Sequence, residues 1–169
     1  MSSTSVSHLH FKSDKGNEAV FGNHISASDM VAFIGDCKSK LRAAGYTGVI
    51  STVETVGTYQ TYPSLCGAVD SVIHANIHAY FDPGTSSDQA GSYVVKQKGM
   101  LADLCGKTVI VSESGWPKGG GNNGAAIASP SDQAAAIGSL KGAGGGITFF
   151  SYTDDLWKPG GVEQNFGNT

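Results

Sequence analysis

The chain of 169 residues carries 11 basic and 14 acidic side chains, has a net charge of −3, and is 40% hydrophobic. Glycine accounts for 24 residues, about twice its usual share of roughly 7%, and proline for only 5. This composition excludes a collagen-like or disordered chain and predicts one domain with a hydrophobic core. A mildly acidic chain cannot neutralise a row of phosphates, and no apolar run reaches the roughly 18 residues of a membrane span. Neither a nucleic acid nor a membrane is therefore expected as a partner.

The chain begins with a polar stretch and continues as alternating helical and strand patterns. Residues 1–15 show no periodicity and no apolar stretch of a secretory signal, so we expect an irregular leader before a domain at 16–169. Helical spacing of apolar residues predicts helices at 28–44, around 64–69, at 87–104 and at 131–141. β-branched and aromatic runs predict strands at 49–53, 72–81, 108–112 and 147–152. A glycine-rich loop is expected at 119–124 and an irregular tail at 153–169.

The predicted strands are short apolar runs without alternation, which is typical of strands buried on both faces. Their alternation with helices predicts the α/β class with a parallel sheet. In such folds function lies beyond the carboxyl ends of the strands. That rule selects Glu54, the segment 78–81, Glu113 and the segment 152–155.

Several motifs for cofactors or metals fail on their spacing. Gly106-Lys107-Thr108 lacks the preceding glycine of a phosphate loop and leads into a strand rather than a helix. His74 and His78 lie four apart on a predicted strand, roughly 13 Å, too far to share a metal ion. The three cysteines form no Cys-x-x-Cys pair, which excludes a structural zinc site and leaves open one disulfide plus a thiol, or three thiols. No metal or cofactor is expected, and no Gly-x-Ser-x-Gly elbow of a serine hydrolase is present.

Glu113 is the most informative residue of the sequence. It leaves a buried strand and enters the turn Ser114-Gly115-Trp116-Pro117. A carboxylate is costly to bury unless it is paired or used, and a neighbouring tryptophan offers the flat apolar face that suits a sugar ring. From position alone, catalysis and a buried structural pair both stay open.

The stretch SESGWPKGG at 112–120 resembles the signature of glycoside hydrolase family 17, the β-1,3-glucanases and β-1,3-glucanosyltransferases of fungi and plants. Three further segments are similar to the family in order and spacing: Gly16-Asn17-Glu18, the stretch NIHAYF at 76–81, and the tail at 152–167. The resemblance covers the chain from Gly16 onward. It implies a (β/α)₈ TIM barrel, which needs roughly 250 residues, so this chain is expected to carry about strands 5–8 as a partial barrel.

The resemblance also implies a mechanism and its residues. Glu113 would be the nucleophile of a retaining double displacement, and Glu18 the general acid and then the base, with the two carboxyl groups about 5–5.5 Å apart. Asp155, Lys158 and Glu163 match a supporting charged network, in which Lys158 would keep Glu113 ionised. The residues implied to contact the sugar are Asn17, His78, Tyr80, Phe81, Trp116, Tyr152 and Trp157.

Two functions follow as alternatives. The first is a retaining endo-β-1,3-glucanase or β-1,3-glucanosyltransferase, with hydrolysis versus transfer left open. The second is a non-catalytic half-barrel with at most weak glucan binding. An open half-barrel exposes two parallel sheet edges, so self-association through those edges is also expected. The resemblance implies an extracellular or cell-wall location.

Overall fold

The computed structural model describes residues 16–169, so the prediction for the leader at 1–15 lies outside the described residues. The helices are α1 (Ala27–Ala43), α2 (Val56–Thr61), α3 (Ser64–Ala68), α4 (Ala90–Cys105) and α5 (Pro130–Gly142). The strands are β1 (Val53–Thr55), β2 (Val72–Asn76), β3 (Thr108–Ser114) and β4 (Ile147–Phe149). Three short 3-10 helices complete the fold: η2 (Ala79–Phe81), η3 (Ser87–Gln89) and η4 (Val162–Gln164). No helix within residues 16–169 is long and apolar enough to cross a membrane.

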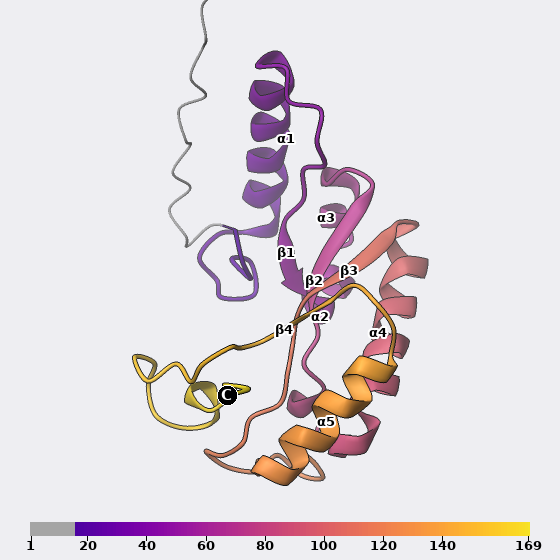
Figure 1. Cartoon of the computed structure of the whole chain (residues 1–169). Coiled ribbons are helices and arrows are strands. Elements are labelled where there is room, and N and C mark those ends of the chain that lie inside the picture. The colour runs from indigo at the N-terminus through magenta and orange to yellow at the C-terminus, as the bar shows by residue number, and fades with distance from the viewer. Residues whose placement is uncertain (1–15) are drawn as a thin grey trace, which may run out of the picture.

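The four strands form one sheet in the order β1-β2-β3-β4, with every neighbouring pair parallel. The predicted α/β class with a parallel sheet is therefore confirmed. Thr55 pairs with Asn76 and Asn76 pairs with Glu113, so the carboxyl ends of three strands lie level. A single parallel bridge from Asn17 to Val53 places the segment before α1 beside β1. In Figure 1 the loop that follows this bridge (indigo) and the C-terminal tail (yellow) lie on the same side of the strands.

All four predicted strands have different bounds in the structure, and the strand expected at 108–112 continues to Ser114. The strand expected at 49–53 begins only at Val53, because Ile50 donates its N–H to the Asp70 carboxylate and Ser51 donates its hydroxyl to the Val72 carbonyl. The strand expected at 72–81 ends at Asn76, where the chain turns toward η2, and the strand expected at 147–152 ends at Phe149. Helix α2 was not predicted, because its β-branched residues are typical of strands. Its start is fixed by the Thr55 hydroxyl, which accepts a hydrogen bond from the Thr58 N–H.

Two contacts bring the helices together. Gly91 of α4 donates its N–H to the Ser139 hydroxyl of α5, and a β-carbon on Gly91 would lie 2.2 Å from the Ser139 carbonyl oxygen. The close approach of α4 and α5 therefore requires glycine at this position. Cys66 of α3 and Cys105 at the end of α4 form a disulfide, and Cys37 is free. This resolves the cysteine question as one disulfide plus one thiol.

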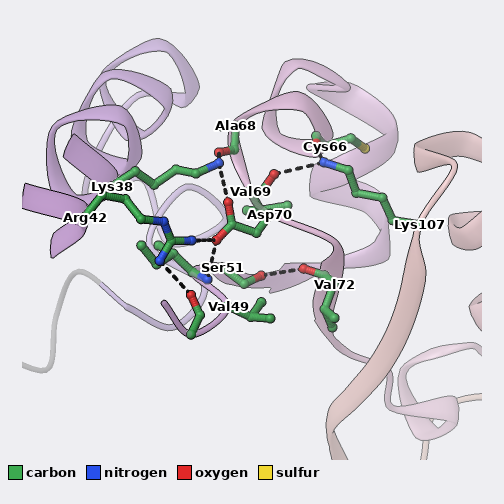
Figure 2. A network of polar contacts seen from close by, with 12 residues as sticks. Lys38, Arg42, Val49, Ser51, Cys66, Ala68, Val69, Asp70, Val72 and Lys107 are labelled. Carbon is green, nitrogen blue, oxygen red and sulfur yellow. Dashed lines mark hydrogen bonds and ion pairs between the residues drawn. The ribbon is translucent and has the colours of Figure 1, made fainter. Parts of the chain in front are cut away.

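A network of charged side chains ties the amino-terminal ends of the strands to α1 (Figure 2). The Asp70 carboxylate pairs with Lys38 at 2.8 Å and with Arg42 at 2.7 Å, and it accepts the Ile50 N–H at 2.8 Å. The hydrogen bond from Lys38 is the main cause that holds the pKa of Asp70 below its usual value. Lys107, which precedes β3, donates to the carbonyls of Cys66 and Val69. This end of the sheet is thus tied together by paired charges, opposite to the end where the strands finish.

Candidate active site

A cleft of about 830 Å³ opens at the carboxyl ends of the strands. Its walls come from the loop before α1, from the ends of β1, β2 and β3, from residues that follow β1, β2 and β4, and from the C-terminal tail. The charged and histidine side chains that line it are Glu18, His78, Glu113, Asp155, Lys158 and Glu163. Sequence reasoning selected each of these six, and the structure brings them into one cavity.

Glu113 lies on a strand with a neighbour on each side. Its backbone carbonyl accepts the Ile77 N–H at 2.9 Å, and the next carbonyl, that of Ser114, accepts the Phe150 N–H at 2.9 Å. A β-carbon on Gly115 would lie 1.9 Å from the Phe150 carbonyl oxygen, so the corner after Glu113 requires glycine. The Glu113 carboxylate points into the cleft, where its Oε2 lies 3.8 Å from Nε2 of His78. The sheet therefore fixes the backbone that carries this carboxylate.

Glu18 reaches the same cleft from outside the regular sheet. Its N–H donates to the Val53 carbonyl at 2.8 Å, and its backbone is left-handed with φ of 50°. Asn76 donates from Nδ2 to Oε1 of Glu18 at 3.0 Å and to Oδ1 of Asn17 at 2.9 Å. Burial raises the pKa of Glu18, the hydrogen bond from Asn76 lowers it in part, and the nearby negative charge of Glu113 raises it further. This carboxyl group is therefore the one of the pair that is suited to hold a proton.

Asp155, Lys158 and Glu163, the three residues of the expected charged network, lie together in the tail. The Lys158 ammonium lies 2.9 Å from the Asp155 carboxylate and 3.8 Å from that of Glu163. Within residues 16–169 these are the ion pairs of Lys158, and Glu113 is not a partner in either. The same ammonium lies 4.7 Å from the ring centre of Phe150 and 5.5 Å from that of Trp157. Lys158 thus holds the tail against the cleft wall at Phe150.

The aromatic residues divide into two groups. Phe81 and Trp157 line the cleft, and Trp157 is 81% exposed. Tyr80 and Trp116 are buried, with ring centres 5.4 Å apart, and their polar atoms donate to the carbonyls of Gly121 and Ile127. The prediction that these two rings line the groove is therefore wrong, because both are packed beneath it. Tyr152 is exposed but lies outside the cleft lining.

Three phenylalanine rings surround the ring of His78. Its ring makes edge contacts with Phe81, Phe150 and Phe166 at centroid distances of 5.5–5.9 Å. Nδ1 of His78 is buried without a hydrogen-bond partner, while Nε2 faces Glu113. These three rings fix the orientation of the imidazole, so that its Nε2 faces the cleft.

Some of the uncharged residues that line the cleft were not predicted from the sequence. Asn76 holds Glu18 and Asn17, and Phe21 and Phe150 add apolar walls. Asn76 ends β2 directly beside Glu113, so the rule that selects strand ends was the available signal for it. Within the part of the chain that the structure describes, no three His, Cys, Asp or Glu side chains are grouped to hold a metal ion.

Solved structures share this arrangement of the chain. A glycoside hydrolase family 17 β-1,3-glucanosyltransferase from Rhizomucor miehei is similar, with a TM-score of 0.74 and 22% identity over 90% of this chain and 56% of that one. A plant β-glucan endohydrolase is similar with a TM-score of 0.65 and 20% identity, over 90% of this chain and 66% of that one. At these identities the likeness shows the fold, which is that of the TIM-barrel glycoside hydrolases in part.

Sequence comparisons identify the family. The probable beta-glucosidase btgE of Aspergillus fumigatus (strain CBS 144.89 / FGSC A1163 / CEA10) is 44% identical over 158 residues, 90% of this chain and 28% of that protein. The probable beta-glucosidase btgE of Emericella nidulans is 40% identical over 162 residues, 90% of this chain and 29% of that protein. This chain thus spans less than a third of the length of these relatives. Residues 15–167 match the family model of the BtgE/BtgC glycoside hydrolase domain, and the chain therefore belongs to that family.

Proposed function

We propose that this domain is a retaining glycoside hydrolase or transglycosylase that acts on β-1,3-glucan, with Glu113 as nucleophile and Glu18 as general acid and base. The observation that carries the proposal is that these two carboxyl groups open into one cleft while burial raises the pKa of Glu18. Two carboxyl groups in different protonation states are what a double displacement requires. A glucanosyltransferase mutant of the same fold has been solved in complex with laminaritriose, which supports a β-1,3-linked ligand here.

In the first step Glu113 attacks the anomeric carbon of the sugar while Glu18 gives its proton to the glycosidic oxygen. The bond from the anomeric carbon to that oxygen breaks, and a bond to the Glu113 carboxylate forms. Because Asn76 donates to Oε1 of Glu18, the proton is assigned to Oε2. A buried site favours the protonated form of Glu18 before the step, since burial disfavours its charge.

In the second step Glu18 acts as base. It takes a proton from water or from a sugar hydroxyl, whose oxygen attacks the anomeric carbon and releases Glu113. Water gives hydrolysis and a sugar gives transfer. We assign sugar contact to Asn17, His78, Phe81 and Trp157, and we assign the pairing of Asp155, Lys158 and Glu163 to holding the tail that carries Trp157.

The test is incubation of the chain with laminari-oligosaccharides, with products separated by chromatography and their anomeric form followed by ¹H NMR. We expect retained configuration and a loss of turnover of at least about 10³-fold in Glu113→Gln. A matched control is Asp29→Asn, an exposed change at the start of α1, which should leave turnover unchanged. Turnover that survives in Glu113→Gln would overturn the proposal. Binding of laminaritriose without any turnover would favour the non-catalytic alternative.

We also propose where the domain acts and how it self-associates. The named relatives are fungal, which supports action on a fungal cell wall outside the cell. The edges of the described sheet are β1 and β4, and parallel edges of this kind present backbone groups to another chain. We therefore propose self-association through these edges. Sedimentation velocity across protein concentrations tests it, and a single monomer species throughout would contradict it.

A further inference from the structure

One buried carboxylate belongs to neither the cleft nor the charged network. Glu54 on β1 is 0% exposed and does not line the cleft. Its Oε1 accepts the Val20 N–H at 2.8 Å and its Oε2 accepts the Phe21 N–H at 3.2 Å. A buried carboxylate is costly unless its oxygens find donors, and here both donors are backbone groups of one turn.

That turn is the one that carries Glu18. The Gly22 N–H donates to the Glu18 carbonyl at 2.8 Å, and the His24 N–H donates to the Ala19 carbonyl at 2.9 Å, so residues 18–24 close on themselves. Glu18 itself donates its N–H to the Val53 carbonyl, one residue before Glu54. In addition to this bond and the Asn17–Val53 bridge, two hydrogen bonds to the side chain of Glu54 tie the turn to β1.

We propose that Glu54 is a positioning residue that holds the Glu18 turn on β1 and thereby aims the Glu18 carboxyl group into the cleft. This inference rests on the proposed function of Glu18. It explains why a glutamate, rather than an apolar residue, occupies a fully buried strand position beside the core. Burial is the main cause that raises the pKa of Glu54, and the negative charge of Glu18 raises it further. The two carboxyl groups therefore also interact electrostatically.

The variant Glu54→Gln removes the carboxylate but keeps the volume of the side chain. Glutamine fills the same space, but it offers one acceptor oxygen and places an NH₂ donor against the second backbone N–H. One of the two hydrogen bonds from Val20 and Phe21 is then lost, and the two N–H donors that face each other there repel. The matched control is Tyr59→Phe, which removes hydrogen bonds from a buried hydroxyl to the carbonyls of Thr52 and His74 but leaves the Glu18 turn untouched.

The first measurement is turnover of two substrates that differ in their need for an acid. The leaving group of a laminari-oligosaccharide is a sugar alkoxide, which needs a proton in order to leave. The leaving group of a dinitrophenyl β-glucoside is dinitrophenolate, which leaves without protonation. In Glu54→Gln we expect kcat/KM to fall about 10–100-fold on the oligosaccharide and less than about threefold on the aryl glucoside. Tyr59→Phe should leave the ratio of the two rates unchanged. Equal losses on both substrates would overturn the positioning role.

The second measurement does not depend on turnover. Backbone hydrogen exchange should become at least about tenfold faster at Val20 and Phe21 in Glu54→Gln and stay unchanged there in Tyr59→Phe. The pKa of the Glu18 carboxyl, measured by ¹³C titration, should also shift in Glu54→Gln and stay unchanged in Tyr59→Phe.

If neither the exchange rates nor this pKa changes in Glu54→Gln, the proposal fails, whatever the activity. If Glu113→Gln keeps activity, the proposed function fails while this measurement still decides on Glu54. Should Glu54→Gln not fold, Glu54→Asp, which keeps the charge but shortens the reach, gives the same readouts.

Discussion

The two carboxyl groups of the cleft are held in different ways. Glu113 lies on β3, which pairs with β2 on one side and β4 on the other. Glu18 lies beyond the sheet, joined to it by one bridge and by side chains, chiefly Asn76 and Glu54. Backbone pairing on both sides places the nucleophile candidate, whereas the acid candidate depends on individual polar contacts. The acid side is therefore where single substitutions change geometry most.

The two ends of the sheet differ in a related way. At the amino-terminal end the charges of Asp70, Lys38 and Arg42 are paired. At the carboxyl end, four buried polar atoms of residues 16–169 have no hydrogen-bond partner: Asn76 Oδ1, His78 Nδ1, Ser112 Oγ and Ser114 Oγ. Unpaired buried groups are costly, and two of these atoms belong to Asn76 and His78, which line the cleft where a ligand can supply partners. We infer that one end of the sheet serves stability and the other serves binding.

The largest effect is expected at Glu18. In Glu18→Ala, turnover of laminari-oligosaccharides should fall about 10²–10⁴-fold, because proton transfer to the leaving oxygen is lost. The loss should be much smaller on a dinitrophenyl glucoside, and added azide should restore part of the rate by taking the place of the activated water. Steady-state kinetics with and without azide measure this. A loss that is equal on both substrates and insensitive to azide would place Glu18 outside acid catalysis.

The two tryptophans should respond in opposite ways. Trp116→Ala empties a fully buried site and should lower the free energy of unfolding by about 3–5 kcal/mol. Trp157→Ala removes an exposed ring of the cleft and should leave that free energy within about 0.5 kcal/mol, while weakening laminaritriose binding about tenfold. Urea unfolding and calorimetric titration separate the two. A binding defect in folded Trp116→Phe would return this ring to the sugar-contacting group.

A smaller effect is expected at the amino-terminal end of the sheet. Asp70→Asn removes the negative charge that pairs with two cations and replaces one of the two acceptor oxygens by an NH₂ donor, and it should cost about 1–2 kcal/mol of stability. Because the pKa of Asp70 is lowered in the fold, its contribution is present above the unfolded pKa and is lost as pH falls through the folded one. Urea unfolding at neutral and at acidic pH should thus show a difference from the wild type that shrinks in acid. Exposed Asp36→Asn serves as the control, since it affects only the i, i+4 pair with Lys40.

The sequence supported the class of fold and the cleft carboxylates, and missed what depends on long-range contacts. The apolar runs at 72–81 and 108–112 predict strands, because strands that are buried on both faces are rich in apolar and β-branched residues. The early end of β2 and the short helix α2 could not be read, because they are set by turn geometry and by the Thr55 cap. The role of Glu54 was also hidden, since its partners lie 33 and 34 residues away. Trp116 was misplaced because an aromatic beside a catalytic motif has the same local pattern whether it lines a groove or supports one.

The smallest effect, and the finest test of the acid side, is a shift in the protonation of Glu18. Asn76→Leu keeps the volume but removes the hydrogen bond to Oε1, which stabilises the charged carboxylate. The pKa of Glu18 should therefore rise above its already raised value, by less than about one unit. A ¹³C titration of the Glu18 carboxyl measures it directly, and in an active enzyme the basic limb of kcat/KM should move to higher pH. A downward shift would mean that Asn76 contacts the protonated form, and Glu18 would then owe its proton to that contact as well as to burial.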